Sequence, residues 1–223
     1  MTDASSQPAP TANSTGPADS TGPDSPAGPI TPADPDGPAI PGIGALRTER
    51  ALDRLDLVAA PVAAALRALS ASKPDLAARA RVVEIDPALA DTETMTEAFG
   101  MDLALSSNCI LVAGRRAGEE RIAACVVRAT TNADVNHVIK RLLDVRKASF
   151  WPQDQAVEAS GMEYGGITPV GVPTGWRLLV DARCARGWSC IGSGLRRSKL
   201  FVPGELLTAL PGAEVVEGLA TEG

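Results

Sequence analysis

The sequence predicts an α+β fold, a single mixed-sheet domain over residues 45–223 with surrounding helices, preceded by a Pro-rich tail over residues 1–44. Three observations predict it. Ten of the eighteen prolines and no aromatic residue fall within residues 1–41, whereas the remainder interleaves helical periodicity with short apolar runs. Several of those runs are joined by turns too short for a parallel crossover, which favours a mixed sheet.

Residues 1–44 combine proline with Ala, Gly, Ser and Thr. Such a composition cannot bury enough apolar surface to offset chain entropy, so we expect a disordered tail. Its Pro-x-x-Pro spacing leaves open a second interpretation, a docking segment for a Pro-binding partner.

The domain opens with apolar residues at mostly helical spacing over 46–69, interrupted around Pro61, which fits two short helices or one kinked helix. Asp134 is a good N-cap for a helix whose apolar residues from Val135 to Leu143 share one face. The sequence predicts further helices over 92–101, 152–159 and 203–210. It predicts strands over 81–85, 109–113, 122–127, 147–150, 177–181, 189–192, 199–202 and 214–216, the second and third forming a hairpin.

Most of the net negative charge lies outside the domain. The chain carries a net charge of −6, but residues 42–223 hold 21 basic against 22 acidic residues. A nearly neutral body excludes a polyanion binder held by bulk charge, while local Arg clusters remain able to meet phosphates. Without an apolar leader or a run long enough to span a bilayer, we expect no membrane partner, a cytoplasmic location and reduced cysteines.

Metal and thiol chemistry have little support. His137 is the sole histidine and points away from the apolar face of its helix, so we interpret it as a solvated surface residue. Cys109 and Cys125 lie in apolar runs without C-x-x-C spacing, which argues against zinc; we expect no metal and no cofactor. Cys184 and Cys190 flank an Arg-containing loop, which leaves a reactive thiol open there.

Two glycine-rich segments carry more chemistry. Gly192-Ser193-Gly194 precedes Arg196, Arg197 and Lys199, cations suited to sugar-phosphate, although the spacing is not that of a P-loop and a plain turn fits equally well. Residues 161–171 form a Gly-dense loop after a helix. That loop is either a structural Ω-loop or a cradle of backbone donors for a carbonyl or carboxylate.

The order of these features resembles the YbaK/EbsC family from about residue 102 to residue 219. The features are a helix, the loop Gly161-Met-Glu-Tyr-Gly-Gly-Ile-Thr-Pro-Val-Gly171, a strand ending at Asp181, Gly-Ser-Gly, and Pro203-Gly204-Glu-Leu-Leu. That family comprises YbaK and ProX-type trans-editing proteins and the insertion domain of bacterial prolyl-tRNA synthetase. The resemblance implies a YbaK-like domain that binds an aminoacyl-tRNA 3′ end, with a synthetase as possible partner, and hydrolyses the ester of a mischarged tRNA such as Ala- or Cys-tRNA(Pro) without a metal.

The resemblance also implies site residues. Gly165, Gly166, Thr168 and Pro169 match the loop that faces the aminoacyl group, with Gly171 just beyond them. The resemblance also implies a set of substrate-binding residues: Asp181, Gly192, Ser193 and Gly194.

One departure is serious. Where the family commonly reads Lys-Thr, this chain reads Asn108-Cys109, so the lysine usually tied to activity is missing. An amide supplies no positive charge to an oxyanion, and losing such a contact costs about a hundred-fold in rate or more. Lys147, Arg128 and Arg197 are possible substitutes; the alternative is a non-catalytic module that only binds an aminoacyl-adenosine end.

Overall fold

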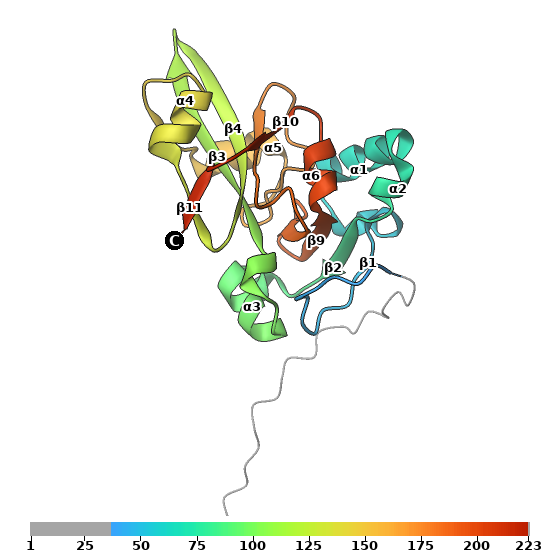
Figure 1. The fold of residues 1–223 in the computed structure, drawn as a ribbon. Helices are drawn as coiled ribbons and strands as arrows, with labels where there is room; N and C mark the ends of the chain where they lie inside the picture. Colours follow the sequence, from blue (N-terminus) through green and yellow to red (C-terminus); the bar gives the residue numbers. More distant parts are fainter. Residues whose placement is uncertain (1–36, 223) are drawn as a thin grey trace, which may run out of the picture.

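The computed structural model describes residues 37–222, and the predicted tail lies outside them up to residue 36. The chain folds into mixed helices and sheets, as predicted (Figure 1). Its α-helices are α1 (Ala60–Ser72), α2 (Pro74–Ala77), α3 (Thr92–Phe99), α4 (Lys140–Leu142), α5 (Gln153–Ser160) and α6 (Gly204–Ala209). Its strands are β1 (Glu49–Arg50), β2 (Arg81–Glu84), β3 (Ser107–Arg116), β4 (Glu119–Arg128), β5 (Thr131–Ala133), β6 (Ala148–Phe150), β7 (Arg177–Asp181), β8 (Trp188–Gly192), β9 (Ser198–Pro203), β10 (Ala213–Val216) and β11 (Ala220–Glu222).

Within residues 37–222 the largest sheet has five strands in the order β10-β7-β4-β3-β6. The β3–β4 hairpin runs in register from Ser107 opposite Arg128 to Arg116 opposite Glu119, while β7 pairs parallel to both β4 and β10. Parallel and antiparallel pairs therefore share one sheet, which confirms the predicted mixed sheet. The hairpin projects to one end of the molecule with α4 beside it, and α1 and α2 lie at the other end (Figure 1).

A second sheet, of order β1-β2-β9-β8, is joined to the first by a single β-bridge in the described chain. There Ser106, just before β3, forms a parallel bridge with Cys190 of β8. The strands of the two sheets diverge beyond this bridge, and the divergence leaves room for a cavity between β3, β8 and β9.

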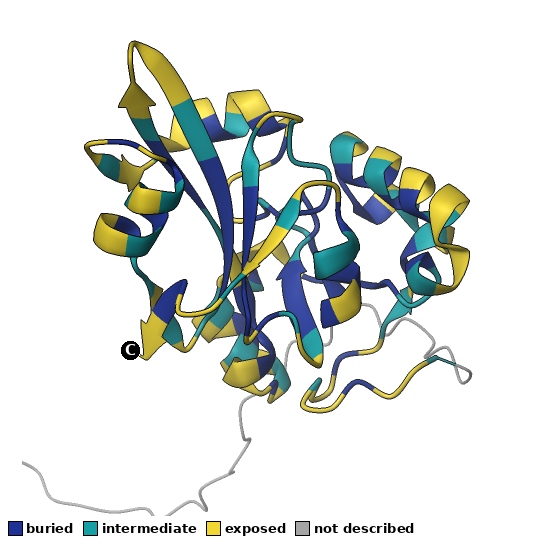
Figure 2. Ribbon diagram, turned by 45° about the horizontal axis from the view of Figure 1, so that its top comes forward, coloured by how far each residue is buried: buried dark blue, intermediate teal, exposed yellow. Residues whose placement is uncertain are grey.

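The core is continuous with this junction. One apolar cluster packs α1 against β7, β8 and β9 through residues such as Leu66, Val180 and Leu200, and a second packs Ile139 against the other face of β3 and β4. Figure 2 shows the buried strands at the centre and exposed residues on the hairpin end and the outer helix faces. No helix between residues 37 and 222 combines the length and apolar character that crossing a bilayer would require.

Some predicted elements shift. The helix expected within residues 46–69 begins only at Ala60, with Pro61 in its first turn, because the residues before it form short 3₁₀ turns at Ala51–Asp53 and Leu55–Leu57. Asp134 caps the helical segment that contains α4 as predicted, its carboxylate accepting the His137 N–H at 2.9 Å, although that segment starts as a π-helical turn over Val135–Ile139.

Residues 37–44, which the sequence places in the tail, contact the domain. Ile40 is buried beside Met101 and Phe201, and the Gly42 carbonyl accepts the Asp102 N–H at 2.8 Å. An isolated Ile-Pro-Gly segment carries no periodic signal, so its packing was not predictable from the sequence.

Candidate active site

A cavity of about 330 Å³ lies where the two sheets diverge. Its walls come from the start of α3, the first half of β3, the 164–167 loop and the facing ends of β8 and β9. The lining residues are Ala90, Asp91, Thr92, Met95, Ser106, Ser107, Asn108, Cys109, Ile110, Tyr164, Gly165, Ile167, Cys190, Ile191, Gly192 and Lys199. The cavity thus gathers three predicted site residues: Asn108, Gly165 and Gly192.

Close backbone packing explains the glycines. The Gly194 N–H donates to the Gly166 carbonyl at 2.7 Å, which ties the 165–169 loop to the end of β8. A Cβ on Gly192 would lie 2.2 Å from the Gly166 carbonyl oxygen, so only glycine permits this approach. Gly165 has a φ of 77°, a left-handed conformation that glycine adopts without strain. The loop is therefore built onto the cavity wall.

Backbone donors are available at this wall. The N–H groups of Gly165 and Ile167 make no hydrogen bond to any residue between 37 and 222, while the intervening Gly166 N–H donates to the Glu163 carbonyl at 3.0 Å. Both free donors belong to residues that line the cavity. Preorganised N–H groups of this kind suit a carbonyl oxygen that gains negative charge.

Lys199 supplies a positive charge to the same cavity. It lies opposite Gly192 in the β8–β9 pairing and is only 8% exposed. Its ammonium makes no hydrogen bond or ion pair with the described part of the chain, and burial lowers the pKa of Lys199 below its ordinary value. A buried, unpaired, pKa-shifted lysine in a cleft is typical of a functional group.

Asn108 lies across the cavity near the start of β3. Its side-chain oxygen accepts the Thr92 hydroxyl at 3.4 Å, a weak contact that links β3 to the first residue of α3. The residue is exposed, so its amide remains accessible to a ligand. Asn108, where the resemblance places the family lysine, therefore faces the same cavity that Lys199 lines from the other sheet.

The rim of the cavity is charged and fixed. Arg196 donates from Nη2 to the Asp91 carboxylate at 2.9 Å and from Nε to the Pro87 carbonyl at 3.1 Å. Its backbone N–H donates to Glu163 Oε2 at 2.6 Å. Tyr164, 58% exposed, stands at the mouth.

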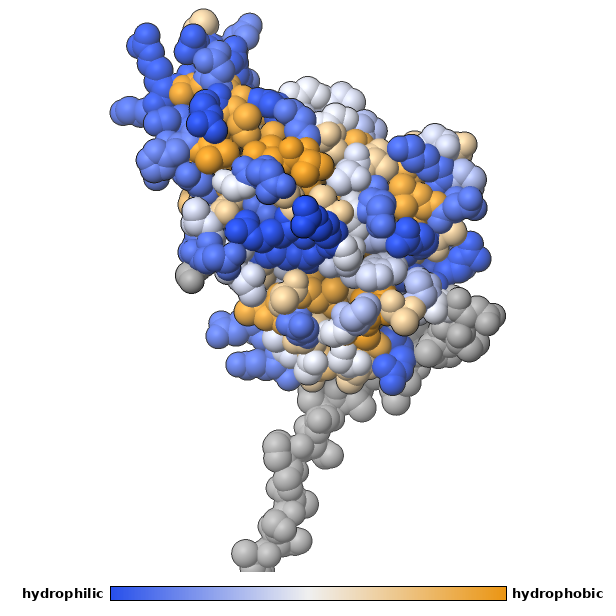
Figure 3. All heavy atoms as spheres, viewed as in Figure 1, coloured by the Kyte–Doolittle hydropathy of each residue, from blue (hydrophilic) through white to orange (hydrophobic). Residues whose placement is uncertain are grey.

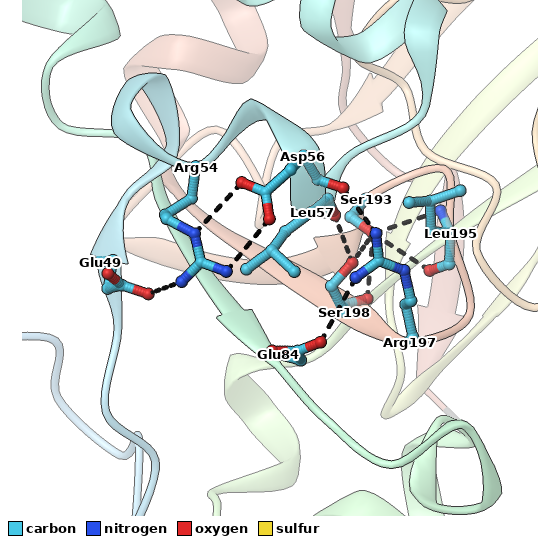
Figure 4. Close-up of polar contacts among 9 residues, drawn as sticks. All are labelled: Glu49, Arg54, Asp56, Leu57, Glu84, Ser193, Leu195, Arg197 and Ser198. Atoms are coloured by element: carbon cyan, nitrogen blue, oxygen red, sulfur yellow. Dashed lines mark hydrogen bonds and ion pairs between the residues drawn. The ribbon is translucent and has the colours of Figure 1, made fainter. Parts of the chain in front are cut away.

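Other predicted site residues serve a different network, shown in Figure 4. Ser193 Oγ lies 2.7 Å from Ser198 Oγ, and Ser198 donates to the Leu57 carbonyl. Arg197 donates to Asp56 O at 2.6 Å and to Glu84 Oε1 at 3.3 Å. Neither Ser193 nor Arg197 lines the cavity, and their polar atoms are occupied by the protein itself.

Asp181 and Arg128 also bind the protein itself. Asp181 is 1% exposed and accepts the N–H groups of Arg183 and Ala220 at 2.9 and 3.0 Å. Arg128 donates to the carbonyls of Trp188 and Arg183 at 2.9 and 3.0 Å, which fixes the loop before β8. Neither side chain lines the cavity.

The second half of the 161–171 loop lies outside this cavity. Pro169 and Gly171 line a separate apolar cavity of about 420 Å³ between α1 and the 172–176 segment. Thr168 lies between the two halves, fully buried, and its hydroxyl has no hydrogen-bond partner among residues 37–222. Lys147 is exposed beside the edge of β3, outside both cavities.

The thiols and the histidine fit the predicted background roles. The four cysteines are free, and burial raises the pKa of Cys190 to about 12 and that of Cys184 above its ordinary value, so neither is a thiolate near neutral pH. His137 is exposed and bonds only to Asp134. Between residues 37 and 222 no three His, Cys, Asp or Glu side chains are grouped to hold a metal.

Sequence reasoning named Lys199 as a phosphate contact and did not connect it with the missing lysine. A signal was present, since Lys199 lies in a strand whose other members are all buried, Leu200, Phe201 and Val202 among them. A lysine in such a strand lies either at the edge of the sheet or in a functional site. Distinguishing the two required the register between β8 and β9.

Comparison with known proteins identifies a family. Residues 86–210 match the model of the aminoacyl-tRNA editing domain. No curated protein matches the chain.

Three solved structures share the fold, each 19% identical over the aligned part. A proposed trans-editing enzyme for prolyl tRNA synthetase aligns with a TM-score of 0.56, covering 71% of this chain and 98% of its own. The hypothetical protein APE2540 aligns at 0.58, with 69% and 97% covered. A computationally designed scaffold for presenting linear epitopes aligns at 0.57, with 74% and 99% covered. Because the family match spans more than half of the sequence and contains every residue that lines the cavity, this chain belongs to the aminoacyl-tRNA editing domain family.

Proposed function

We propose that this protein is an aminoacyl-tRNA deacylase, which hydrolyses the ester joining a wrong amino acid to the 3′-terminal adenosine of a tRNA. The single observation that carries the proposal is Lys199, a buried cation without a partner among the described residues, facing a cavity lined by free backbone donors. It offers the positive charge that Asn108 does not.

The chemistry needs no covalent enzyme intermediate. A water oxygen bonds to the ester carbonyl carbon, and the carbonyl oxygen becomes an oxyanion stabilised by the Lys199 ammonium and by the N–H groups of Gly165 and Ile167. Collapse breaks the bond between the carbonyl carbon and the ribose oxygen, and the proton from water ends on that leaving oxygen. Asn108 is placed to hold a ribose hydroxyl near this bond.

The size of the cavity favours a small amino acid. About 330 Å³ is at the lower end of the range for ligand sites, and the ester and ribose take part of it. Met95, Ile110 and Ile167 make the remaining wall apolar, which suits alanine or cysteine. Ala-tRNA(Pro) and Cys-tRNA(Pro) are therefore the substrates to test first, a choice also suggested by the trans-editing enzyme for prolyl tRNA synthetase among the structural neighbours.

The test is deacylation of Ala-tRNA(Pro), Cys-tRNA(Pro) and cognate Pro-tRNA(Pro) by wild type, Lys199→Met and Lys199→Arg. We expect wild type to hydrolyse a mischarged tRNA and Lys199→Met to lose about a hundred-fold or more, because an oxyanion contact is removed. Lys73→Met is the matched control, since Lys73 is exposed at the end of α1 and distant from the cavity lining. Equal rates for wild type and Lys199→Met would overturn the role of Lys199.

The alternative, a non-catalytic binding module, is decided in the same experiment. It predicts that no tRNA is deacylated above buffer while an aminoacyl-adenosine analogue still raises the melting temperature of wild type.

A further inference from the structure

The end of the β3–β4 hairpin carries a local positive charge. Residues 115–121 and 140–147, which we call the basic end, hold seven arginines and lysines against three acidic residues, whereas the whole chain has a net charge of −6. The two segments are in contact, because Asp144 pairs with Arg116 at 3.3 Å and with Arg121 at 3.0 Å. In Figure 3 hydrophilic side chains surround an apolar patch at this projecting end.

Most of these cations are unpaired. Arg115, Lys140, Arg141, Arg146 and Lys147 make no side-chain hydrogen bond or ion pair with any residue from 37 to 222. The remaining acidic residues, Glu119 and Glu120, lie opposite Arg116 and Arg115 in the hairpin register. The unpaired positive charge is therefore concentrated in the 140–147 segment, which contacts β4 where Arg121 Nη1 donates to the Leu143 carbonyl at 3.0 Å.

Strand β3 runs from the cavity to this segment, and the exposed β6 residues Ser149 and Phe150 lie beside its buried middle. Asn108 and Ile110 line the cavity, Val112 pairs with Phe150 of β6, and Gly114 pairs with Ala148, next to Lys147. Phe150 is 64% exposed although it is a large apolar ring. From Asn108 to Arg115 the strand extends about 23 Å, so the cavity, the exposed ring and the basic end follow one another over that length.

We propose that the basic end binds the sugar-phosphate backbone of the tRNA acceptor stem while the 3′ end occupies the cavity, with Phe150 contacting an unpaired nucleotide between them. The inference rests on the proposed function. Unpaired arginines and lysines beside an exposed aromatic ring are what a nucleic-acid strand requires. Because the rest of the domain is nearly neutral or acidic, a local surface of this kind is needed to hold a polyanion.

The test measures binding of uncharged tRNA at several salt concentrations to wild type and to the triple variant Arg141→Gln, Arg146→Gln, Lys147→Gln. We expect the triple variant to bind about ten-fold more weakly or worse at 50 mM salt, and the slope of log affinity against log salt to fall by about two to three. The matched control is Arg67→Gln, Lys73→Gln, Arg186→Gln, three exposed cations elsewhere, which should leave the slope near that of wild type. Two results would overturn the proposal. One is an equal loss of tRNA affinity in both triple variants, and the other is an affinity of the basic-end variant equal to that of wild type.

A second measurement separates this inference from the proposed function. Hydrolysis of a small aminoacyl-adenosine ester should be the same in wild type and the basic-end variant, whereas hydrolysis of mischarged tRNA should fall in the variant only. Equal hydrolysis of mischarged tRNA by both would also overturn the inference. If wild type cleaves neither ester, the deacylase proposal fails, and the salt dependence of tRNA binding still decides the role of the basic end.

Phe150 gives an independent readout. Phe150→Ala should weaken tRNA binding about five-fold or more without changing the salt slope, because stacking is not ionic, and Phe150→Tyr should restore it. Unchanged binding by Phe150→Ala would remove the aromatic contact from the proposal.

Discussion

Ser198 and Lys199 are consecutive residues of β9, and their side chains point to opposite faces of the strand. The Ser198 hydroxyl lies among Ser193 and Leu57 in a network where each polar atom has a protein partner. The Lys199 ammonium faces the cavity and has no partner among the described residues. Both residues are buried, so burial alone does not distinguish a structural polar group from a functional one; Lys199 differs from Ser198 because it both lacks a partner and lines the cavity.

The same contrast applies to the glycines. Gly194 and Gly166 are bonded to each other and fix the loop, whereas Gly165 and Ile167 keep free N–H groups at the cavity wall. A polar group that the fold leaves unsatisfied costs stability. Its retention is explained when a ligand completes it. Four predictions test this distinction, in order of the effect expected.

Ser198→Ala should lower the free energy of unfolding by about 1–3 kcal/mol, because it leaves buried partners of the network unsatisfied. Denaturant unfolding measures the change, with Ser149→Ala on exposed β6 as control. Deacylation per folded molecule should be retained. If Ser198→Ala kept its free energy of unfolding but lost deacylation, Ser198 would be a functional residue and not a structural one.

Lys199→Met should do the opposite and raise the free energy of unfolding by roughly 0.5–2 kcal/mol at neutral pH while activity is lost. Burial lowers the pKa of Lys199, so the folded state disfavours the charged form. The gain should be full below the folded pKa and should vanish as pH rises through the unfolded value, near 10.5. Melting curves from pH 7 to 10.5 measure it, and a loss of stability at pH 7 would show that Lys199 is a structural residue.

The pH dependence of deacylation sharpens the contrast. If the ammonium is the active form, the rate above buffer should decline as pH rises through the lowered pKa of Lys199, and Lys199→Arg should move the decline to higher pH. Asn108→Lys should move the decline to lower pH without increasing the rate at pH 7, because a second cation in the cavity disfavours the first. A large increase in rate for Asn108→Lys would mean that Lys199 does not replace the family lysine.

The smallest effect is expected at Arg197, the cation two residues before Lys199. Its side chain is 43% exposed and pairs with Glu84, so Arg197→Gln should cost less than about 1 kcal/mol and change the deacylation rate by less than about two-fold. Unfolding and deacylation assays side by side measure both. A large fall in rate would return Arg197 to the active site.

Local sequence signals predicted the elements well where a residue has a local physical role. Gly100 and Gly161 end α3 and α5 in left-handed conformations, and Asp134 caps its helix, since these roles depend on neighbours a few residues away. The short strands β1, β5 and β11 were not predicted. Each has two or three residues, and its partner lies far along the chain, so no local pattern marks it.

The candidate site was predicted in part for the same reason. Glycine spacing identifies the 161–171 loop and the Gly-Ser-Gly segment. It does not reveal which atoms of a segment face a cavity. Ser193 and Arg197 turn to the network in Figure 4, and Pro169 and Gly171 turn to the apolar cavity behind it. The absence of the family lysine at Asn108 was visible, whereas Lys199, which we propose takes its place, lies on another sheet.

By itself the sequence determined the family, the mixed α+β composition and the glycines that the loop requires, because these depend on residue type and order. Only the tertiary structure decided that Lys199 and Asn108 share a cavity and that Asp181 and Arg128 do not. The physical reason is that a cavity is formed by strands from two sheets, brought together by the Ser106–Cys190 bridge between residues 84 positions apart. Which buried polar group finds a partner there is a property of that packing.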